Sequence, residues 1–258
     1  MQTIPTFHNS YPVRTVYTNR GDLSGRNQQE RMEDIAAFLD TDIDRLILAD
    51  ETHSGTILVM DENDPDGRVE HTDESHTIRH KGGFDSMITT LPNVLLCVST
   101  ADCVPVFLYD PIGHVAAMVH SGWRGTLAGI AANTVRVMEC VFHTDPKSVL
   151  AAFGPCICGK CYEVGAELVE LFSKRENGIE AEKYFVPRKG DKYLFDNKGV
   201  ILRDLLTCGG LEERNIYDAG ICSYETDTYA SYRRDGKLDR ETQTLSGIVL
   251  KKRNRQGG

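Results

Sequence analysis

Two short apolar runs joined by a turn restrict the fold of this chain more than any other feature of its sequence. Residues 104–109 (VPVFLY) and 115–120 (VAAMVH) have the length and the residue types of buried strands, and the segment DPIGH lies between them. A Pro-x-Gly turn between two such runs predicts a hairpin of antiparallel strands. Because Cys103 stands just before the first strand and His120 ends the second, the hairpin places a thiol beside an imidazole.

The remaining apolar runs predict a sheet-rich fold with a few helices. Further strands are expected at residues 45–49, 56–60, 94–99 and 149–153. Apolar residues that recur every three or four positions predict a helix over about 126–141. Two shorter helices are expected near 164–172 and 197–206, the second capped by Asp196. We therefore predict an α+β fold with mixed sheets flanked by helices. No repeat or linker divides the chain, so residues 1–258 are expected to form a single layered domain.

Composition and charge exclude several classes of protein. The formal charge of −9 and the isoelectric point near 5.4 argue against a nucleic-acid binder, because attraction to phosphates requires clustered basic residues. No apolar run approaches the ~18 residues of a membrane span, and the N-terminal segment lacks the apolar centre of a signal peptide. We therefore expect a cytoplasmic protein, and nothing in the sequence marks a surface for a protein partner. In that reducing compartment, the eight cysteines are expected to be core residues, metal ligands or catalytic groups.

The Cys103 and His120 pair has two chemical interpretations. As a nucleophile and its base, the histidine would lower the pKa of the thiol, which would then attack a carbon centre. As metal ligands, one cysteine and one histidine suit Zn²⁺, which needs a third protein ligand and an open position for catalysis. The third ligand has two sources: His53, which lies directly before an apolar strand, or a histidine cluster. The members of that cluster, which lie in a polar segment expected to form a surface loop, are His71, His76 and His80.

Two other segments suggest a binding pocket. Arg124 lies in SGWRG, where glycines and the predicted start of a helix indicate a site for a phosphate or a carboxylate. Residues 229–240 (YASYRRDGKLDR) bring tyrosines and arginines together, which is typical either of a substrate-pocket wall or of a solvated strand and turn.

The sequence positions of several other cysteines indicate structural roles. The C-x-x-C of Cys158 and Cys161 has no second C-x-x-C as a partner, so a structural turn is favoured over a zinc ribbon. Cys97 lies in a predicted strand and Cys140 in a predicted helix, and both are expected in the core.

Several segments, taken in chain order, resemble the motifs of one known family. They are VYTNRGDLSG (16–25), ADETHSG (49–55), FDSMITT (84–90), TADCVPV (100–106), VHSGWRG (119–125), GPCICGKCYEVG (154–165) and YASYRRDG (229–236). The family is known as multicopper polyphenol oxidase, or laccase-like, and has since been assigned purine nucleoside phosphorylase activity. The resemblance covers nearly the whole chain. The sequence departs from the family pattern at Glu51 and Ser54, where Gln and Gly are usual, and at residues 237–240, where KLDR replaces T-G-R.

The resemblance implies a metal site formed by His53, Cys103 and His120, with Zn²⁺ as the metal. It also implies a layered α+β fold shared distantly with bacterial toxin deamidases that use a Cys–His pair. The implied reaction is phosphorolysis of adenosine, inosine and S-methyl-5′-thioadenosine to the free base and ribose 1-phosphate or its methylthio analogue. Deamination of adenosine, by a water that zinc activates, is implied as a second activity.

Purine nucleosides and phosphate are thus the expected partners of the site. An arginine pocket would hold the phosphate dianion against the anomeric carbon of the ribose. The candidates for that pocket are, in falling order, Arg124, Arg20 and Arg233, with Tyr232 as a further substrate-binding residue.

Three alternative functions compete with this one. A polyphenol oxidase would use Cu²⁺, but oxidising phenols with dioxygen requires several coppers and therefore many histidine ligands. A metal-free amidohydrolase would use Cys103 as the nucleophile and His120 as its base. A non-catalytic protein would hold a structural zinc, for which four protein ligands are usual.

Overall fold

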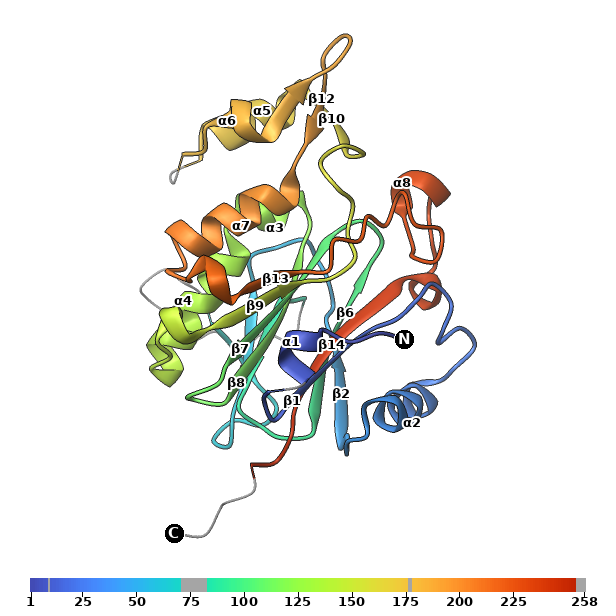
Figure 1. Ribbon diagram of the computed structural model, residues 1–258, viewed down its shortest axis with the longest axis vertical. Helices are drawn as coiled ribbons and strands as arrows, with labels where there is room; N and C mark the ends of the chain where they lie inside the picture. Colours follow the sequence, from blue (N-terminus) through green and yellow to red (C-terminus); the bar gives the residue numbers. More distant parts are fainter. Residues whose placement is uncertain (9, 71–82, 176–177, 254–258) are drawn as a thin grey trace.

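Two β-sheets packed face to face lie at the centre of the structure (Figure 1). The computed structural model describes residues 1–8, 10–70, 83–175 and 178–253. The larger sheet contains, in spatial order, β13 (Ile216–Asp218), β9 (Leu150–Phe153), β7 (Val104–Asp110), β8 (Val115–Ser121), β5 (Ser86–Thr89), β3 (Ile57–Met60) and β4 (Arg68–Glu70). The smaller sheet contains β1 (Val13–Tyr17), β14 (Thr244–Leu250), β6 (Val94–Thr100) and β2 (Arg45–Leu48). Both sheets combine parallel and antiparallel pairs, which confirms the predicted α+β class with mixed sheets.

The predicted hairpin is confirmed as β7 and β8. The strands are antiparallel, with Val104 opposite Ser121 and Pro105 opposite His120. The turn lies at residues 111–114, where the sequence placed it. This register puts His120 beside the loop that carries Cys103, as predicted.

Helices cover the outer face of each sheet and give the fold its layers. The helices α4 (Ile130–Phe142) and α7 (Asn197–Thr207) pack on the larger sheet, and α2 (Gln28–Leu39) packs on the smaller one. Two single-turn helices, α1 (Pro5–His8) and α8 (Tyr232–Asp235), complete this part of the chain.

Strand β7 is buried on both of its faces. Phe107 and Tyr109 point into the core between the sheets, whereas Val106 and Leu108 face the helices. Two-sided burial requires apolar residues at every position, which explains the unbroken run in the sequence. Each such side chain contributes about 1.5–3 kcal/mol when it leaves water.

The helix predicted over 126–141 is in fact two helices. The first, α3, spans Trp123–Leu127, and α4 begins at Ile130. Between them Gly129 has a φ of 74°, a left-handed conformation that glycine adopts without strain and that ends one helix before the next begins. The periodic apolar pattern runs through this break because Leu127 of α3 and Ile130 of α4 keep the three-residue spacing, although their side chains pack in different clusters.

The other two helix predictions differ in accuracy. The helix expected at 197–206 is α7, and the Asp196 side chain accepts a hydrogen bond from the Gly199 amide at 2.9 Å, as a helix cap does. The helix expected at 164–172 is shifted: α5 spans Ala166–Ser173, and a short strand, β10 (Glu163–Gly165), precedes it.

A third, small sheet lies beyond α3 and α7 (Figure 1). Its strands are β10, β12 (Lys192–Phe195) and β11 (Phe185–Pro187), and α5 and α6 (Ala181–Tyr184) pack beside it. Its core is aromatic, with the rings of Phe185 and Phe195 stacked 4.4 Å apart. Trp123 of α3 packs against this cluster, so the small sheet supports the start of that helix.

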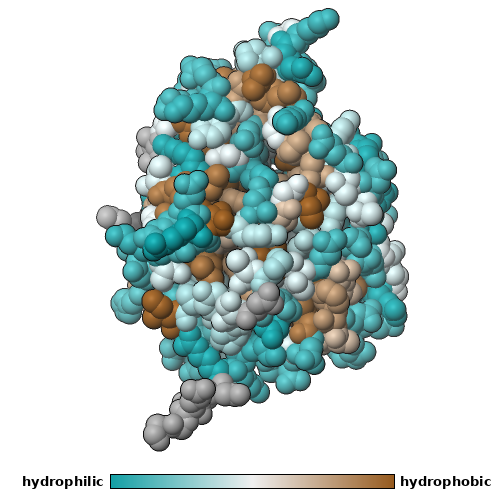
Figure 2. Space-filling view, viewed as in Figure 1, coloured by the Kyte–Doolittle hydropathy of each residue, from teal (hydrophilic) through white to brown (hydrophobic). Residues whose placement is uncertain are grey.

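One face of the surface is mostly hydrophilic, and the predictions for the remaining cysteines are confirmed only in part. Hydrophilic side chains cover most of the face drawn in Figure 2, with small separate apolar areas. Cys97 is buried in β6 as predicted, but Cys140 is exposed, because its position on α4 faces away from the larger sheet. The histidine cluster His71, His76 and His80 lies outside the described residues. Within those residues, no helix is both long and apolar enough to cross a membrane.

Candidate functional site

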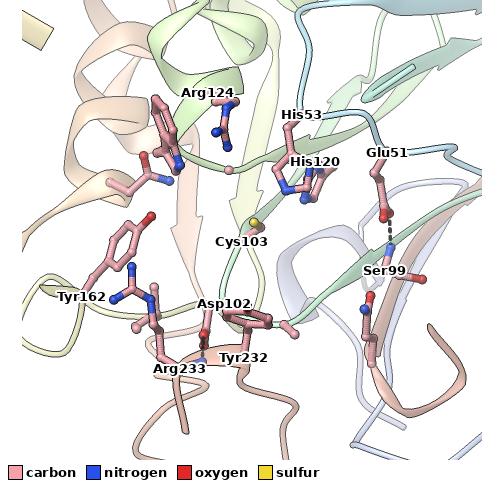
Figure 3. Close-up of a pocket in the computed structure, with 16 residues that line it drawn as sticks. Glu51, His53, Ser99, Asp102, Cys103, His120, Arg124, Tyr162, Tyr232 and Arg233 are labelled. Carbon is pink, nitrogen blue, oxygen red and sulfur yellow. Dashed lines mark hydrogen bonds between the residues drawn. The ribbon is translucent and has the colours of Figure 1, made fainter. Parts of the chain in front are cut away.

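Two loops and the end of a strand bring His53, Cys103 and His120 to one point (Figure 3). Cys103 lies in the short loop between β6 and β7, His120 lies near the end of β8, and His53 lies between β2 and β3. One ligand atom from each residue lies within 4.8 Å of the others. His53 has a φ of 58°, an uncommon conformation for a residue other than glycine. Of the two sources of a third ligand that the sequence left open, the structure therefore brings His53 to the pair.

Gly122 leaves the front of this cluster free. A Cβ atom at Gly122 would lie 3.0 Å from the Cys103 sulfur and 3.0 Å from His53 Cδ2. Any side chain there would crowd the Cys103 sulfur and the His53 ring. A sulfur and two imidazole nitrogens around such a space are a donor set that fits Zn²⁺ with an open coordination position.

Asp85 fixes two of the three candidate ligands. Its carboxylate is fully buried directly before β5. One oxygen lies 2.8 Å from His120 Nδ1 and accepts a hydrogen bond from the His53 amide at 3.0 Å. The other oxygen accepts hydrogen bonds from the Ser54 amide at 2.7 Å and the Ser54 hydroxyl at 2.8 Å. The Nδ1 contact leaves Nε2 of His120 for a ligand, as in carboxylate–histidine–metal arrangements.

The charges of this cluster are strongly coupled. Burial alone would raise the pKa of Cys103, but the neighbouring His120 and His53 outweigh it and hold that pKa below its ordinary value. Burial would lower the pKa of His120, but Cys103 and Asp85 raise it above its ordinary value. Burial would raise the pKa of Asp85, whereas hydrogen bonds from His120 and Ser54 lower it to about 2. The Cys103 thiol is thus prepared for ionisation, which a metal ligand and a nucleophile both require.

A cavity of about 430 Å³ opens beside the three candidate ligands. Arg124 lies on one side of it, with Arg233, Tyr162 and Tyr232 across from it (Figure 3). The guanidinium of Arg124 lies 4.1 Å from the centre of the Trp123 ring, and that of Arg233 lies 4.9 Å from the Tyr162 ring. Both cations are therefore held by an aromatic face.

Arg20 is placed differently from the other two candidate arginines. It does not line the cavity, and its guanidinium forms an ion pair with Asp235 at 2.9 Å. Among the predicted phosphate-binding residues, the structure thus brings Arg124, Arg233 and Tyr232 to the cavity and leaves Arg20 outside its lining, paired with the last residue of α8.

Sequence reasoning missed several residues of the site. Asp102, next to Cys103, is buried with a φ of 89° and accepts hydrogen bonds from the Ser223 hydroxyl at 2.7 Å and the Arg233 amide at 2.8 Å. Asn197 lines the cavity although it is buried, and its Oδ1 atom has no hydrogen-bond partner. A search for isolated polar residues at the start of apolar segments would have found Asp85, whereas Asn197 comes from a helix distant in sequence.

Comparison with known proteins gives consistent matches over most of the chain. Residues 16–250 match the family described as multi-copper polyphenol oxidoreductase laccase. The chain is 32% identical over 257 residues to adenosine deaminase RL5 of an unknown prokaryotic organism, covering 93% of this chain and 94% of that protein. It is 30% identical over 210 residues to purine nucleoside phosphorylase YlmD of Bacillus subtilis strain 168, covering 81% of this chain and 73% of that protein.

The fold also matches a solved structure. The crystal structure of hypothetical protein YfiH from Bacillus licheniformis superposes with a TM-score of 0.76 at 26% identity and covers 93% of both chains.

Proposed function

This chain belongs to the family described as multi-copper polyphenol oxidoreductase laccase, and from that membership we propose that it is a zinc-dependent purine nucleoside phosphorylase that also deaminates adenosine. The relatives named adenosine deaminase RL5 and purine nucleoside phosphorylase YlmD support the two reactions. The observation that carries the proposal is the convergence of His53, Cys103 and His120 beside a cavity lined by two arginines.

We propose that these three residues hold zinc. The sulfur and imidazole donors and the space kept free by Gly122 fit that ion. When bound, zinc supplies a Lewis acid that polarises an oxygen atom at its open position. Asp85 keeps the His53 loop and the His120 ring in place for that role.

In phosphorolysis, the bond between the ribose C1′ and the purine nitrogen breaks, and a phosphate oxygen forms the new bond to C1′. The departing base takes up the proton that the attacking hydrogen phosphate loses. Arg124 is proposed to hold the phosphate, because a guanidinium pairs two of its N–H groups with two phosphate oxygens. Arg233, fixed on the Tyr162 ring with its Nη1 bonded to the Glu163 carbonyl at 2.7 Å, adds positive charge across the cavity.

Asn197 is proposed to recognise the purine base. Its Nδ2 donates to the Ser121 carbonyl at 3.2 Å, which leaves the buried Oδ1 as an unpartnered acceptor beside the cavity. The 6-amino group of adenine and the N1–H of hypoxanthine can each donate a hydrogen bond to this oxygen. In deamination the C6–N bond breaks, a water oxygen bonds to C6, and ammonia leaves.

One incubation tests the proposed reactions. Protein of measured metal content is incubated with adenosine, with and without phosphate, and adenine, hypoxanthine and inosine are separated. We expect adenine and ribose 1-phosphate only with phosphate, and inosine with or without it. Cys103→Ala should abolish all products, whereas Cys140→Ala, which removes an exposed cysteine, should not. Unchanged turnover by a zinc-free Cys103→Ala protein would exclude the proposal.

A second candidate function rests on the same residues. Cys103, His120 and Asp85 have the arrangement of a nucleophile, its base and the group that orients the base, with His120 Nδ1 2.8 Å from the carboxylate. This is the metal-free amidohydrolase interpretation. Removing metal with a chelator distinguishes the two, because it leaves a Cys–His hydrolase active and inactivates a zinc enzyme.

The described residues favour zinc over the copper of a polyphenol oxidase. In that part of the chain, the groups able to hold a metal contain two histidines between them. A multicopper centre that reduces dioxygen requires many more. Metal analysis of protein prepared without added copper tests this choice.

A further inference from the structure

A second group of side chains able to bind a metal comes from the segment just before Tyr162 and from residues 222–225. Cys158, Cys161, Cys222 and Glu225 each present one ligand atom, and all four atoms lie within 4.8 Å of one another. The first two residues form the C-x-x-C for which the sequence offers no second C-x-x-C as a partner. The partner is C-x-x-E, residues 222–225, in which a carboxylate takes the place of the second thiol.

The backbone brings these two turns together. Cys156 and Cys222 form a parallel bridge, so the two segments run side by side into the cluster. Cys158 begins a tight turn, in which its carbonyl accepts hydrogen bonds from the Cys161 amide at 3.0 Å and the Tyr162 amide at 3.2 Å. The Cys222 carbonyl accepts from the Thr226 amide at 3.0 Å, which closes the second turn.

From this geometry we infer that Cys158, Cys161, Cys222 and Glu225 form a structural zinc site, separate from the proposed catalytic one. Tetrahedral zinc with Zn–S of about 2.3 Å and Zn–O of about 2.0 Å places a sulfur and an oxygen ligand about 3.5 Å apart. The Cys161 sulfur and the Glu225 Oε1 atom lie 3.5 Å apart. The Cys158 amide points at the Cys222 sulfur, with 3.4 Å between the two atoms, as amides do toward metal-bound thiolates.

The proposed zinc links two walls of the catalytic cavity. Tyr162, which follows Cys161, lines that cavity and carries Arg233 on its ring. Ser223, which follows Cys222, donates to Asp102 beside Cys103. A closed site with four protein ligands therefore has a structural role here: it holds the residues that shape the cavity, and it has no open position for substrate.

Metal counting on the full chain tests this inference. Protein loaded with zinc and freed of excess should hold two zinc ions per chain if both sites are formed. Cys161→Ser and Cys103→Ala should each hold one, because each removes a different site, and Cys140→Ser, at an exposed cysteine, should hold two. In Cys103→Ala protein loaded with cobalt, sulfur-to-cobalt charge-transfer absorption should persist, and it should vanish when Cys161→Ser is added.

The substitution Glu225→Gln keeps all three thiols and changes an exposed residue. It therefore tests the second site if the Cys161→Ser protein does not fold. It should lose the second zinc to a chelator at ~10-fold lower concentration than the parent protein does. A second zinc that survives Cys161→Ser, or is held by Glu225→Gln as tightly as by the parent, overturns the inference. So does protection of two of the three cysteines Cys158, Cys161 and Cys222 from a thiol reagent without a second zinc, if a reductant reverses it, since that result indicates a disulfide. None of these outcomes depends on nucleoside turnover, and the loss of one zinc ion on Cys161→Ser tests the second site whether or not the first site holds zinc.

Discussion

Replacing Asp85 by asparagine should weaken the proposed metal site and destabilise the fold at the same time. The buried carboxylate has two oxygens, and each meets two close donors: the His53 amide and His120 Nδ1 on one side, and the Ser54 amide and hydroxyl on the other. Asparagine offers one acceptor and one NH₂ group. Whichever way it is oriented, two donors lose their acceptor.

The structure sets the size of this effect. A hydrogen bond to a charged group contributes about 1.5–3 kcal/mol, so two lost bonds correspond to roughly 3–6 kcal/mol of unfolding free energy. At about 2–4 °C per kcal/mol for a chain of this size, the melting temperature should fall by roughly 6–24 °C. Zinc affinity should fall by about 10- to 100-fold, as is usual when the partner of a ligating histidine is removed.

Asp110→Asn is the matched control for this measurement. Asp110 is also buried but lies at the turn of the β7–β8 hairpin, opposite the end that carries Cys103 and His120, and its Oδ1 accepts from the Ile112 amide at 2.8 Å. Thermal unfolding followed by circular dichroism, together with zinc release to a chelator, should show a smaller loss of stability and unchanged zinc affinity for this variant. If Asp85→Asn melted at the parent temperature and retained zinc equally well, the reasoning would be wrong.

Three further variants test other parts of the structure. Arg124→Ala should raise the apparent KM for phosphate by roughly 10- to 100-fold with little change in the KM for nucleoside, because it removes a charge-assisted contact; equal KM values for phosphate in variant and parent would exclude that role. Asn197→Ala should raise the KM for nucleosides by about 10-fold and leave the KM for phosphate unchanged, which steady-state kinetics with both substrates varied will measure. A raised KM for phosphate with an unchanged KM for nucleosides would contradict the assignment. Phe195→Ala should cost about 3–5 kcal/mol by leaving a cavity in the aromatic core, while Leu171→Ala, at a residue 43% exposed, should cost far less; equal urea midpoints for the two variants would contradict the packing described.

The strands were predictable because local pattern determines them. A run such as residues 104–109 is apolar at every position since β7 is buried on both faces, and no helix fits so short a segment. The hairpin then gave the Cys103 and His120 pair without further information. The helix break at Gly129 was missed because the apolar periodicity continues across it, whereas the left-handed φ that separates the helices leaves no trace in that periodicity.

The parts of the site that the sequence could not supply depend on contacts between distant segments. His53 was a candidate ligand on its residue type, but only the fold decides that Asp85 holds its loop against the hairpin. Glu225 was overlooked because a search for zinc knuckles looks for paired cysteines. Its partnership with Cys161 follows from the bridge between Cys156 and Cys222, which are far apart in the sequence.

The hydrogen bonds that Asp85 accepts affect how quickly and how tightly the site can bind a ligand. The loop carrying His53 is exposed to solvent, yet its amides at His53 and Ser54 are anchored to a buried carboxylate. When the backbone of a residue becomes fixed only on binding, the lost conformational entropy makes the binding free energy less favourable by about 1–2 kcal/mol per residue. Here that ordering is completed when the chain folds, so an incoming ion or nucleoside meets a surface already in its final shape. Hydrogen exchange at these two amides should therefore be slow despite their position in an open loop.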